Sequence, residues 1–292
     1  MFRHIVVAVD GSPNSLKALD RAVNLAAQTR ASLDIISVEE ELPRYVSKQS
    51  EVAAEKSAAE RYFGQVHAAA ALDAAERGVT IASKVLTGHE VQTLLIYVAD
   101  QRADLLVIGA TGHSGVWSAF LGSTADKLVA HAPSSVLVVQ PGDAGQTYRE
   151  LLVGIDGSAN GEFALSVALA LCQISGGTLR GITVIEDSRS IGSPRTPTVP
   201  AAITVIQDRA VAAAKAAGVN LELAVRHGHA DRALIQFAEE VDADLVVIGA
   251  TGNERPASPT AGGTARRIAN EARCSVLLAR PTSSDPSRLT NV

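Results

Sequence analysis

The sequence predicts an α/β protein built from two tandem domains, each a doubly wound parallel sheet with helices on both faces. Three observations predict this fold class. The chain repeats itself, each repeat alternates short β-branched runs with stretches of helical periodicity, and its 292 residues are about twice the usual size of a domain.

The internal repeat covers nearly the whole chain. The segment HIVVAVDGSPNSLKALDRAVNLAA returns as ELLVGIDGSANGEFALSVALALCQ, so that Asp10 matches Asp156, 146 positions later. Further on, ADLLVIGATG returns as ADLVVIGATG after only 140 positions, so the second copy has lost six residues in its central part. The stretch QPGDAGQTYRE between the copies contains Pro and Gly, and we expect domains over residues 1–142 and 149–282.

Within the first copy, strands and helices are expected to alternate. The run IVVAVD is typical of a strand buried on both faces, and LKALDRAVNLAAQ has apolar residues at helical spacing, with Ser12 or Asn14 as its cap. The expected strands are 5–10, 32–39, 79–86, 104–109 and 134–140, and the expected helices are 16–28, 50–77, 89–101 and 123–132. Right-handed crossovers then give a Rossmann-like, five-stranded sheet in the order 3-2-1-4-5.

Composition excludes several classes of protein. Hydrophobic residues make up 47% of the chain and charged ones 20%, which is globular composition, and the net charge of -5 offers no attraction to nucleic acid or anionic membrane. The two cysteines cannot build a disulfide framework or a metal cluster, and no metal site is expected. No segment approaches the ~20 apolar residues of a membrane span. We therefore expect a cytoplasmic protein.

The turn after the fourth strand is the first candidate binding element, because ligands of doubly wound sheets bind at the carboxyl ends of strands where the strand order reverses. Gly109 and Gly112 let the backbone turn and approach a ligand. Gly122 precedes a helix whose free amides and dipole favour an anion, and the hydroxyls of Ser123 and Thr124 can donate to phosphate oxygens.

Asp10 follows the first strand and faces the same edge, where it can accept a hydrogen bond from a ribose hydroxyl. Lys127 is expected to supply compensating positive charge. Each residue also has a purely structural interpretation. The glycines can be turn residues, Ser123 can be a helix cap, and Asp10 can cap the first helix. The recurrence of the whole set in the second copy favours a binding site.

The spacing Gly109-x2-Gly112-x9-Gly122-Ser123, with Asp10 after the first strand, resembles the ATP-binding pattern of the universal stress protein family. The resemblance spans both copies. It implies that Asp10 contacts ribose, that the backbone of Val38 contacts adenine, and that Ala8 lines the adenine pocket. The residues that it implies for phosphates and ribose are Gly109, Gly112, Gly122, Ser123 and Thr124. It also implies a fused pseudo-dimer that pairs SSVLVVQ with CSVLLAR, and a homodimer of such chains stays open.

The second copy departs from the pattern at one position. The residues that keep it are Asp156, Val184, Gly249, Gly252, Gly262 and Thr264. Gly263 replaces the serine, Pro256 and Pro259 stiffen the intervening loop, and Arg266 and Arg267 can supply positive charge. Weaker or altered nucleotide binding by this copy and normal binding both stay open.

No catalytic residue is assigned. The P-loop pattern is absent, and the sequence places no carboxylate beside the phosphate loop to orient a water. The favoured hypothesis is a nucleotide-responsive stress or regulatory module, in which ATP orders the loop between Gly112 and Gly122 and a protein partner reads the change. ADP and AMP are alternative ligands, and Mg²⁺ stays open as a companion ion. The rival hypotheses are a slow ATPase or other nucleotide-dependent enzyme, and a non-binding paralogue that acts through protein contacts.

Overall fold

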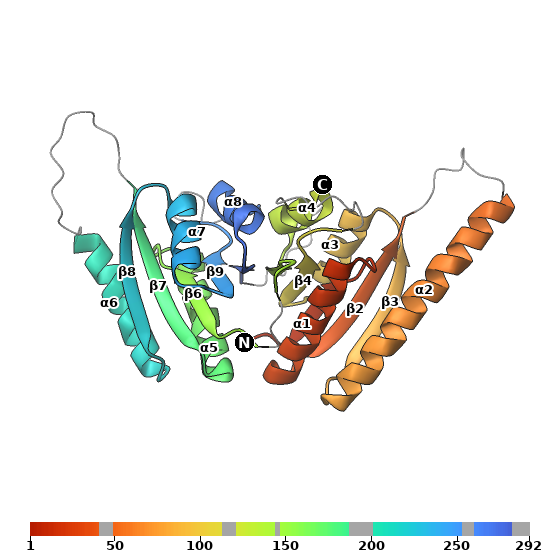
Figure 1. The fold of residues 1–292 in the computed structure, drawn as a ribbon, viewed down its shortest axis with the longest axis horizontal. Helices are drawn as coiled ribbons and strands as arrows, with labels where there is room; N and C mark the ends of the chain where they lie inside the picture. The colour runs from red at the N-terminus through yellow and green to blue at the C-terminus, as the bar shows by residue number, and fades with distance from the viewer. Residues whose placement is uncertain (41–48, 113–120, 144–146, 187–200, 253–259, 282–292) are drawn as a thin grey trace. The chain divides into compact units, whose positions relative to one another are not determined.

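The computed structural model describes residues 1–40, 49–112, 121–143, 147–186, 201–252 and 260–281, with the backbone alone for residues 49–60. The chain divides into two compact units, the first containing Met1–Gln146 and the second Thr147–Pro281. The first unit carries the first copy of the repeat and the second unit the second copy (Figure 1).

The first unit is a five-stranded parallel sheet in the order β3-β2-β1-β4-β5. Its strands are β1 (His4–Ala8), β2 (Ser32–Glu39), β3 (Ile81–Thr87), β4 (Leu105–Gly109) and β5 (Ser135–Val139). Its helices are α1 (Pro13–Thr29), α2 (Gln49–Glu76), α3 (Glu90–Asp100) and α4 (Ser123–His131). The predicted fold class and strand order are confirmed.

The second unit repeats this topology in the order β8-β7-β6-β9-β10. Its strands are β6 (Glu150–Gly154), β7 (Thr178–Ile185), β8 (Leu221–His227), β9 (Leu245–Gly249) and β10 (Ser275–Ala279). Its helices are α5 (Ala159–Ser175), α6 (Ala201–Ala216), α7 (Ala230–Glu240) and α8 (Gly263–Glu271). The six-residue loss falls in the crossover from β7 to β8, which carries the short helix α6.

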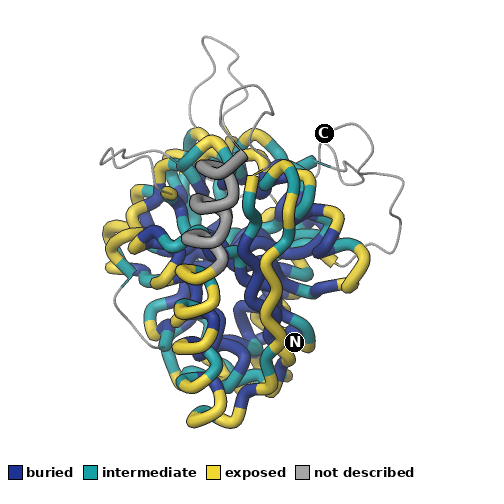
Figure 2. The backbone as a smooth tube through the Cα atoms, turned by 90° about the vertical axis from the view of Figure 1, so that its right-hand side faces the viewer, coloured by how far each residue is buried: buried dark blue, intermediate teal, exposed yellow. Residues whose placement is uncertain are grey.

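Helices cover both faces of each sheet. In the first unit α1 packs with α2 on one face and α3 packs with α4 on the other; α5 with α6 and α7 with α8 do the same in the second unit (Figure 1). The central strands are fully buried, with Ile5, Val6 and Val7 of β1 at 0% exposure. The edge strand β3 is exposed along most of its length (Figure 2). This burial explains the unbroken β-branched runs of the inner strands.

Helix α1 begins at Pro13, three residues before the expected start, and its cap is one of the two predicted residues. The Ser12 side chain accepts a hydrogen bond from the backbone N–H of Ser15 at 3.2 Å, so Ser12 rather than Asn14 is the cap. Pro13 follows in the first turn, where its missing N–H costs no hydrogen bond.

Within the described residues, no helix is both long and apolar enough to cross a bilayer.

A buried polar cluster fixes α3 to the sheet of the first unit. The Asp34 carboxylate is 8% exposed and accepts a hydrogen bond from the Tyr97 hydroxyl at 2.8 Å. The ring nitrogen Nε2 of His4 lies 2.9 Å from the same carboxylate oxygen. In the second unit the acidic residue stands at the position of His4 and a basic one at that of Asp34, and Arg180 pairs with Glu150 at 2.5 Å.

Candidate functional site

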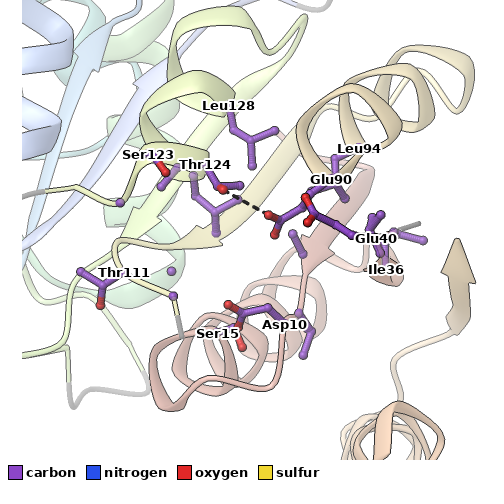
Figure 3. Close-up of a pocket in the computed structure, with 18 of the residues that line it drawn as sticks. Asp10, Ser15, Ile36, Glu40, Glu90, Leu94, Thr111, Ser123, Thr124 and Leu128 are labelled. Atoms are coloured by element: carbon purple, nitrogen blue, oxygen red, sulfur yellow. Dashed lines mark hydrogen bonds between the residues drawn. The ribbon is translucent and has the colours of Figure 1, made fainter. Parts of the chain in front are cut away.

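A cavity of about 420 Å³ opens at the carboxyl edge of the first unit's sheet (Figure 3). Its walls come from the ends of β1, β2 and β4 and the starts of α3 and α4. The structure brings together in its lining all the residues that the family resemblance implies for the first copy: Ala8, Asp10, Val38, Gly109, Gly112, Gly122, Ser123 and Thr124.

The topology explains this position. Strand β1 pairs with β2 on one side and β4 on the other, so the connections that leave β1 and β4 run toward opposite faces of the sheet. The carboxyl ends of these two strands therefore leave a crevice, which is where doubly wound sheets take their ligands.

Asp10 and Gly112 are packed against each other in this crevice. One carboxylate oxygen of Asp10, Oδ1, accepts a hydrogen bond from the backbone N–H of Ser12 at 2.9 Å, which fixes the side chain beside the start of α1. A Cβ added at Gly112 would lie 2.8 Å from the other oxygen, Oδ2. Any larger residue at position 112 must therefore displace the carboxylate.

Gly109 has a packing role of its own. A Cβ at this position would lie 2.9 Å from the carbonyl carbon of Asn14, because the backbone of α1 passes over the end of β4. The matching Gly249 meets the backbone of Asn160 at the same distance, 2.9 Å. Close packing against α1 is therefore enough to explain a glycine at position 109, whether or not a ligand binds beside it.

The start of α4 lacks the side-chain cap that α1 has. Gly122 is its N-cap residue and makes no side-chain hydrogen bond to the first turn, while its own N–H donates to the carbonyl of Ala110 at 2.8 Å. Ser123 and Thr124 follow in the first turn, and both line the cavity. A helix start of this kind, with no capping side chain, is suited to an anion.

Two carboxylates that the sequence reasoning did not place also line the cavity. Glu90 begins α3, Glu40 follows β2, and both side chains lie beside the cavity in Figure 3. The Thr124 hydroxyl Oγ1 donates to Glu90 Oε2 at 3.1 Å. The expectation that no carboxylate lies beside the phosphate loop is therefore wrong. Position 90 follows the carboxyl end of β3, which lies at the same edge of the sheet as the carboxyl ends of β1 and β4. The order of the strands therefore predicts that Glu90 lies near the cavity.

Burial is the main cause that raises the pKa of Glu90 above its ordinary value. The hydrogen bond from Thr124 opposes the rise, the charges of Asp10 and Glu40 add to it, and His89 opposes it. The described lining contains three acidic residues and no Lys or Arg. Lys127, expected to compensate a phosphate charge, is exposed on α4 and is not among these lining residues.

A buried histidine supports the wall of the cavity from behind. The Ser37 hydroxyl donates to the carbonyl of Val9 at 2.6 Å, so His67 Nε2, 3.0 Å from that hydroxyl, must be the donor to it. The His67 ring centroid lies 6.5 Å from that of Phe63, which lines the cavity. Burial lowers the pKa of His67 below its ordinary value.

This histidine predicts acid sensitivity. The unfolded chain takes up a proton near the ordinary His67 pKa of 6.5, before the folded state does, so its contribution to stability is complete above that pH and is lost as the pH falls through it. We expect His67→Gln, which copies Gln207 at the matching position, to lose less stability on mild acidification than the natural protein. Urea midpoints at neutral and mildly acidic pH measure this difference, and equal losses would contradict it.

The second unit keeps the frame of the site. Asp156 Oδ1 accepts hydrogen bonds from the N–H and the hydroxyl of Ser158 at 2.9 and 2.7 Å. A Cβ at Gly252 would lie 3.1 Å from Asp156 Oδ2, a milder contact than the 2.8 Å between a Cβ at Gly112 and Asp10 Oδ2. Gly262 is again an N-cap residue without a capping side chain.

The chemistry of the second unit nevertheless differs. Its remaining predicted residues are Val184 near the end of β7, Gly249 at the end of β9 and Thr264 in the first turn of α8. Gly263 supplies no hydroxyl, and Ala230 replaces the carboxylate of Glu90. Arg267, expected to supply positive charge, is ion-paired with Asp231 on α7. Pro256, Pro259 and the loop of the first copy at 113–120 lie outside the described residues.

Comparison with known proteins agrees with both units. The model of the Universal stress protein family matches residues 1–140 and 147–280. The chain belongs to the universal stress protein family.

Relatives of this universal stress protein share its tandem length. Universal stress protein Rv1996 of Mycobacterium tuberculosis is 28% identical over 305 residues, with 94% of each chain covered. The solved universal stress protein from Archaeoglobus fulgidus is 17% identical, with a TM-score of 0.72 over 97% of each chain, a likeness of fold. Another universal stress protein, solved in complex with cAMP, is 28% identical with a TM-score of 0.38, over 47% of this chain and 97% of its own.

Proposed function

We propose that this universal stress protein binds an adenine nucleotide, with ATP as the expected ligand, in the cavity of the first unit. The observation that carries the proposal is the shared crevice of Asp10 and the uncapped start of α4, with Gly112 packed against the Asp10 carboxylate. A carboxylate suits ribose hydroxyls and a bare helix start suits phosphate. The cavity of about 420 Å³ is of the size that small-molecule sites have.

The residues divide between the parts of the ligand. Ala8 and the backbone of Val38 would face adenine, and Asp10 would accept from ribose. The residues that would receive phosphates and ribose are Gly109, Gly112, Gly122, Ser123 and Thr124. The bound nucleotide would serve as a signal that a protein partner reads in the cytoplasm, and Mg²⁺ would accompany the phosphates if it binds.

Asp10→Asn tests the proposal. The amide keeps an oxygen to accept from the Ser12 N–H but loses the charge and one acceptor, and we expect the Kd for ATP to rise about tenfold or more. Isothermal titration of the full chain measures this, with ADP formation followed in the same samples to separate binding from slow hydrolysis. Asp100→Asn, an exposed change at the end of α3, is the control.

Asp156→Asn makes the same change in the second unit. A smaller loss than that of Asp10→Asn would support unequal sites, and an equal loss would support two working sites. Unchanged ATP binding by Asp10→Asn would contradict the proposed role of the first cavity.

A further inference from the structure

Glu90 occupies the part of the first cavity that an anionic ligand would have to share. We propose that Glu90 limits how much negative charge this cavity accepts, so that the cavity distinguishes adenine nucleotides by their number of phosphates. The inference rests on the proposed function, because it concerns the same cavity and the same ligand class.

The geometry places Glu90 in competition with phosphate for one hydrogen. Thr124 lies in the first turn of α4, at the helix start proposed to receive phosphate, and its hydroxyl donates to Glu90 Oε2 at 3.1 Å. A hydroxyl carries a single hydrogen, so an ionised Glu90 withholds it from a phosphate oxygen. A phosphate that enters must displace this hydrogen bond or do without the Thr124 donor.

The surrounding charges act in the same direction. Glu90 shares the cavity lining with Asp10 and Glu40, and no Lys or Arg among the described lining residues offsets them. Two like charges repel more strongly in such a partly buried place than in water, because the effective dielectric constant is lower. Burial already raises the pKa of Glu90, which means that the site disfavours its charge before any ligand arrives.

The second unit carries a natural comparison. Ala230 stands at the position of Glu90, and Thr264 at that of Thr124. The second unit therefore has the hydroxyl without a carboxylate at the position of Glu90, while its Glu186, which matches Glu40, accepts a hydrogen bond from the Ala230 N–H at 3.4 Å. We therefore expect the limit that Glu90 sets on the charge of the ligand only in the first unit.

The test compares ATP with adenosine, which shares base and sugar but carries no charge. We would titrate both into the full chain at neutral pH, constant ionic strength and with chelator present, using the natural protein, Glu90→Gln and the control Glu76→Gln, an exposed change at the end of α2. Glu90→Gln should lower the Kd for ATP about tenfold and leave that for adenosine within about twofold. Glu76→Gln should change neither.

Acidification supplies a second readout. As the pH falls toward the raised pKa of Glu90, its protonation should tighten ATP binding relative to adenosine in the natural protein more than in Glu90→Gln. Three groups face Glu90 and are retained in both proteins: Asp10 and Glu40, which follow β1 and β2, and His89, the N-cap residue of α3. The ligand's own titration is also the same in both. The difference between the two proteins in the pH dependence of ATP affinity relative to adenosine affinity therefore reports on Glu90.

Glu90→Ala, which copies Ala230, guards against a failure of the glutamine variant to fold, and should tighten ATP binding in the same way. ATP binding that is equally tight in the natural protein and both variants would overturn this inference and leave the proposed function standing. Absence of binding of either ligand by any of the proteins would overturn both.

Discussion

Gly112→Ala should weaken ATP binding by the first unit about 100-fold while leaving the protein folded. The added methyl group would stand 2.8 Å from Asp10 Oδ2, and the carboxylate must move away from it. The hydrogen bond from the Ser12 N–H at 2.9 Å holds the other carboxylate oxygen, so the movement breaks either this bond or the alignment toward ribose. Loss of one charge-assisted hydrogen bond costs about 1.5–3 kcal/mol, which corresponds to a loss of about 10- to 100-fold, and the lost backbone approach adds to it.

The matched control for this change is Gly64→Ala on α2. A Cβ at Gly64 meets no atom within 4 Å, so it alters neither packing nor the cavity. Isothermal titration measures the affinity, and thermal unfolding shows whether each variant is folded. If Gly112→Ala bound ATP as the natural protein does, Asp10 and the glycine loop could not form one site.

Asp34→Ala should lower the free energy of unfolding by about 3 kcal/mol, the largest effect on stability that we predict. The Tyr97 hydroxyl donates to this carboxylate, and the Tyr97 side chain is buried. Burial and the hydrogen bond to Asp34 raise the pKa of Tyr97, so the tyrosine stays a protonated donor at every ordinary pH. Removing the acceptor leaves that hydroxyl and His4 without their shared partner inside the unit.

Urea unfolding followed by circular dichroism measures this loss. Asp73→Ala is the control, because it removes a partly exposed carboxylate near the end of α2 that pairs at 2.8 Å with Arg77, the residue after the helix, and should cost less than about 1 kcal/mol. A loss for Asp34→Ala no greater than that of the control would show that the buried cluster does not fix α3 to the sheet.

The order of elements could be predicted because its signals are local. The expected strand over 32–39 has the bounds of β2, and the other strands and helices of the first unit agree within a few residues. The repeat then carried the same assignment into the second unit. The common edge of Asp10, Gly112 and Gly122 followed as well, since parallel strands bring their carboxyl ends together.

Side-chain directions and partners could not be predicted in the same way. Glu90 reads in sequence as an ordinary acidic residue in the first turn of a helix, and its contact with Thr124 depends on how α3 packs on α4. Lys127 lies one turn into α4 but is exposed, because the helix turns it away from the described lining. Arg180 stands in the second unit where Asp34 stands in the first. This difference is explained only by their partners across the paired strands, which are Glu150 and His4.

The most direct test of the central claim is equilibrium dialysis of the purified full chain against ATP, with ADP and AMP in parallel. We predict saturable binding of at least about one nucleotide per chain, since the first unit holds the complete set of residues, with the second unit adding up to one more. Absence of saturable binding of all three nucleotides at millimolar concentrations would contradict the claim that the first cavity is a nucleotide site.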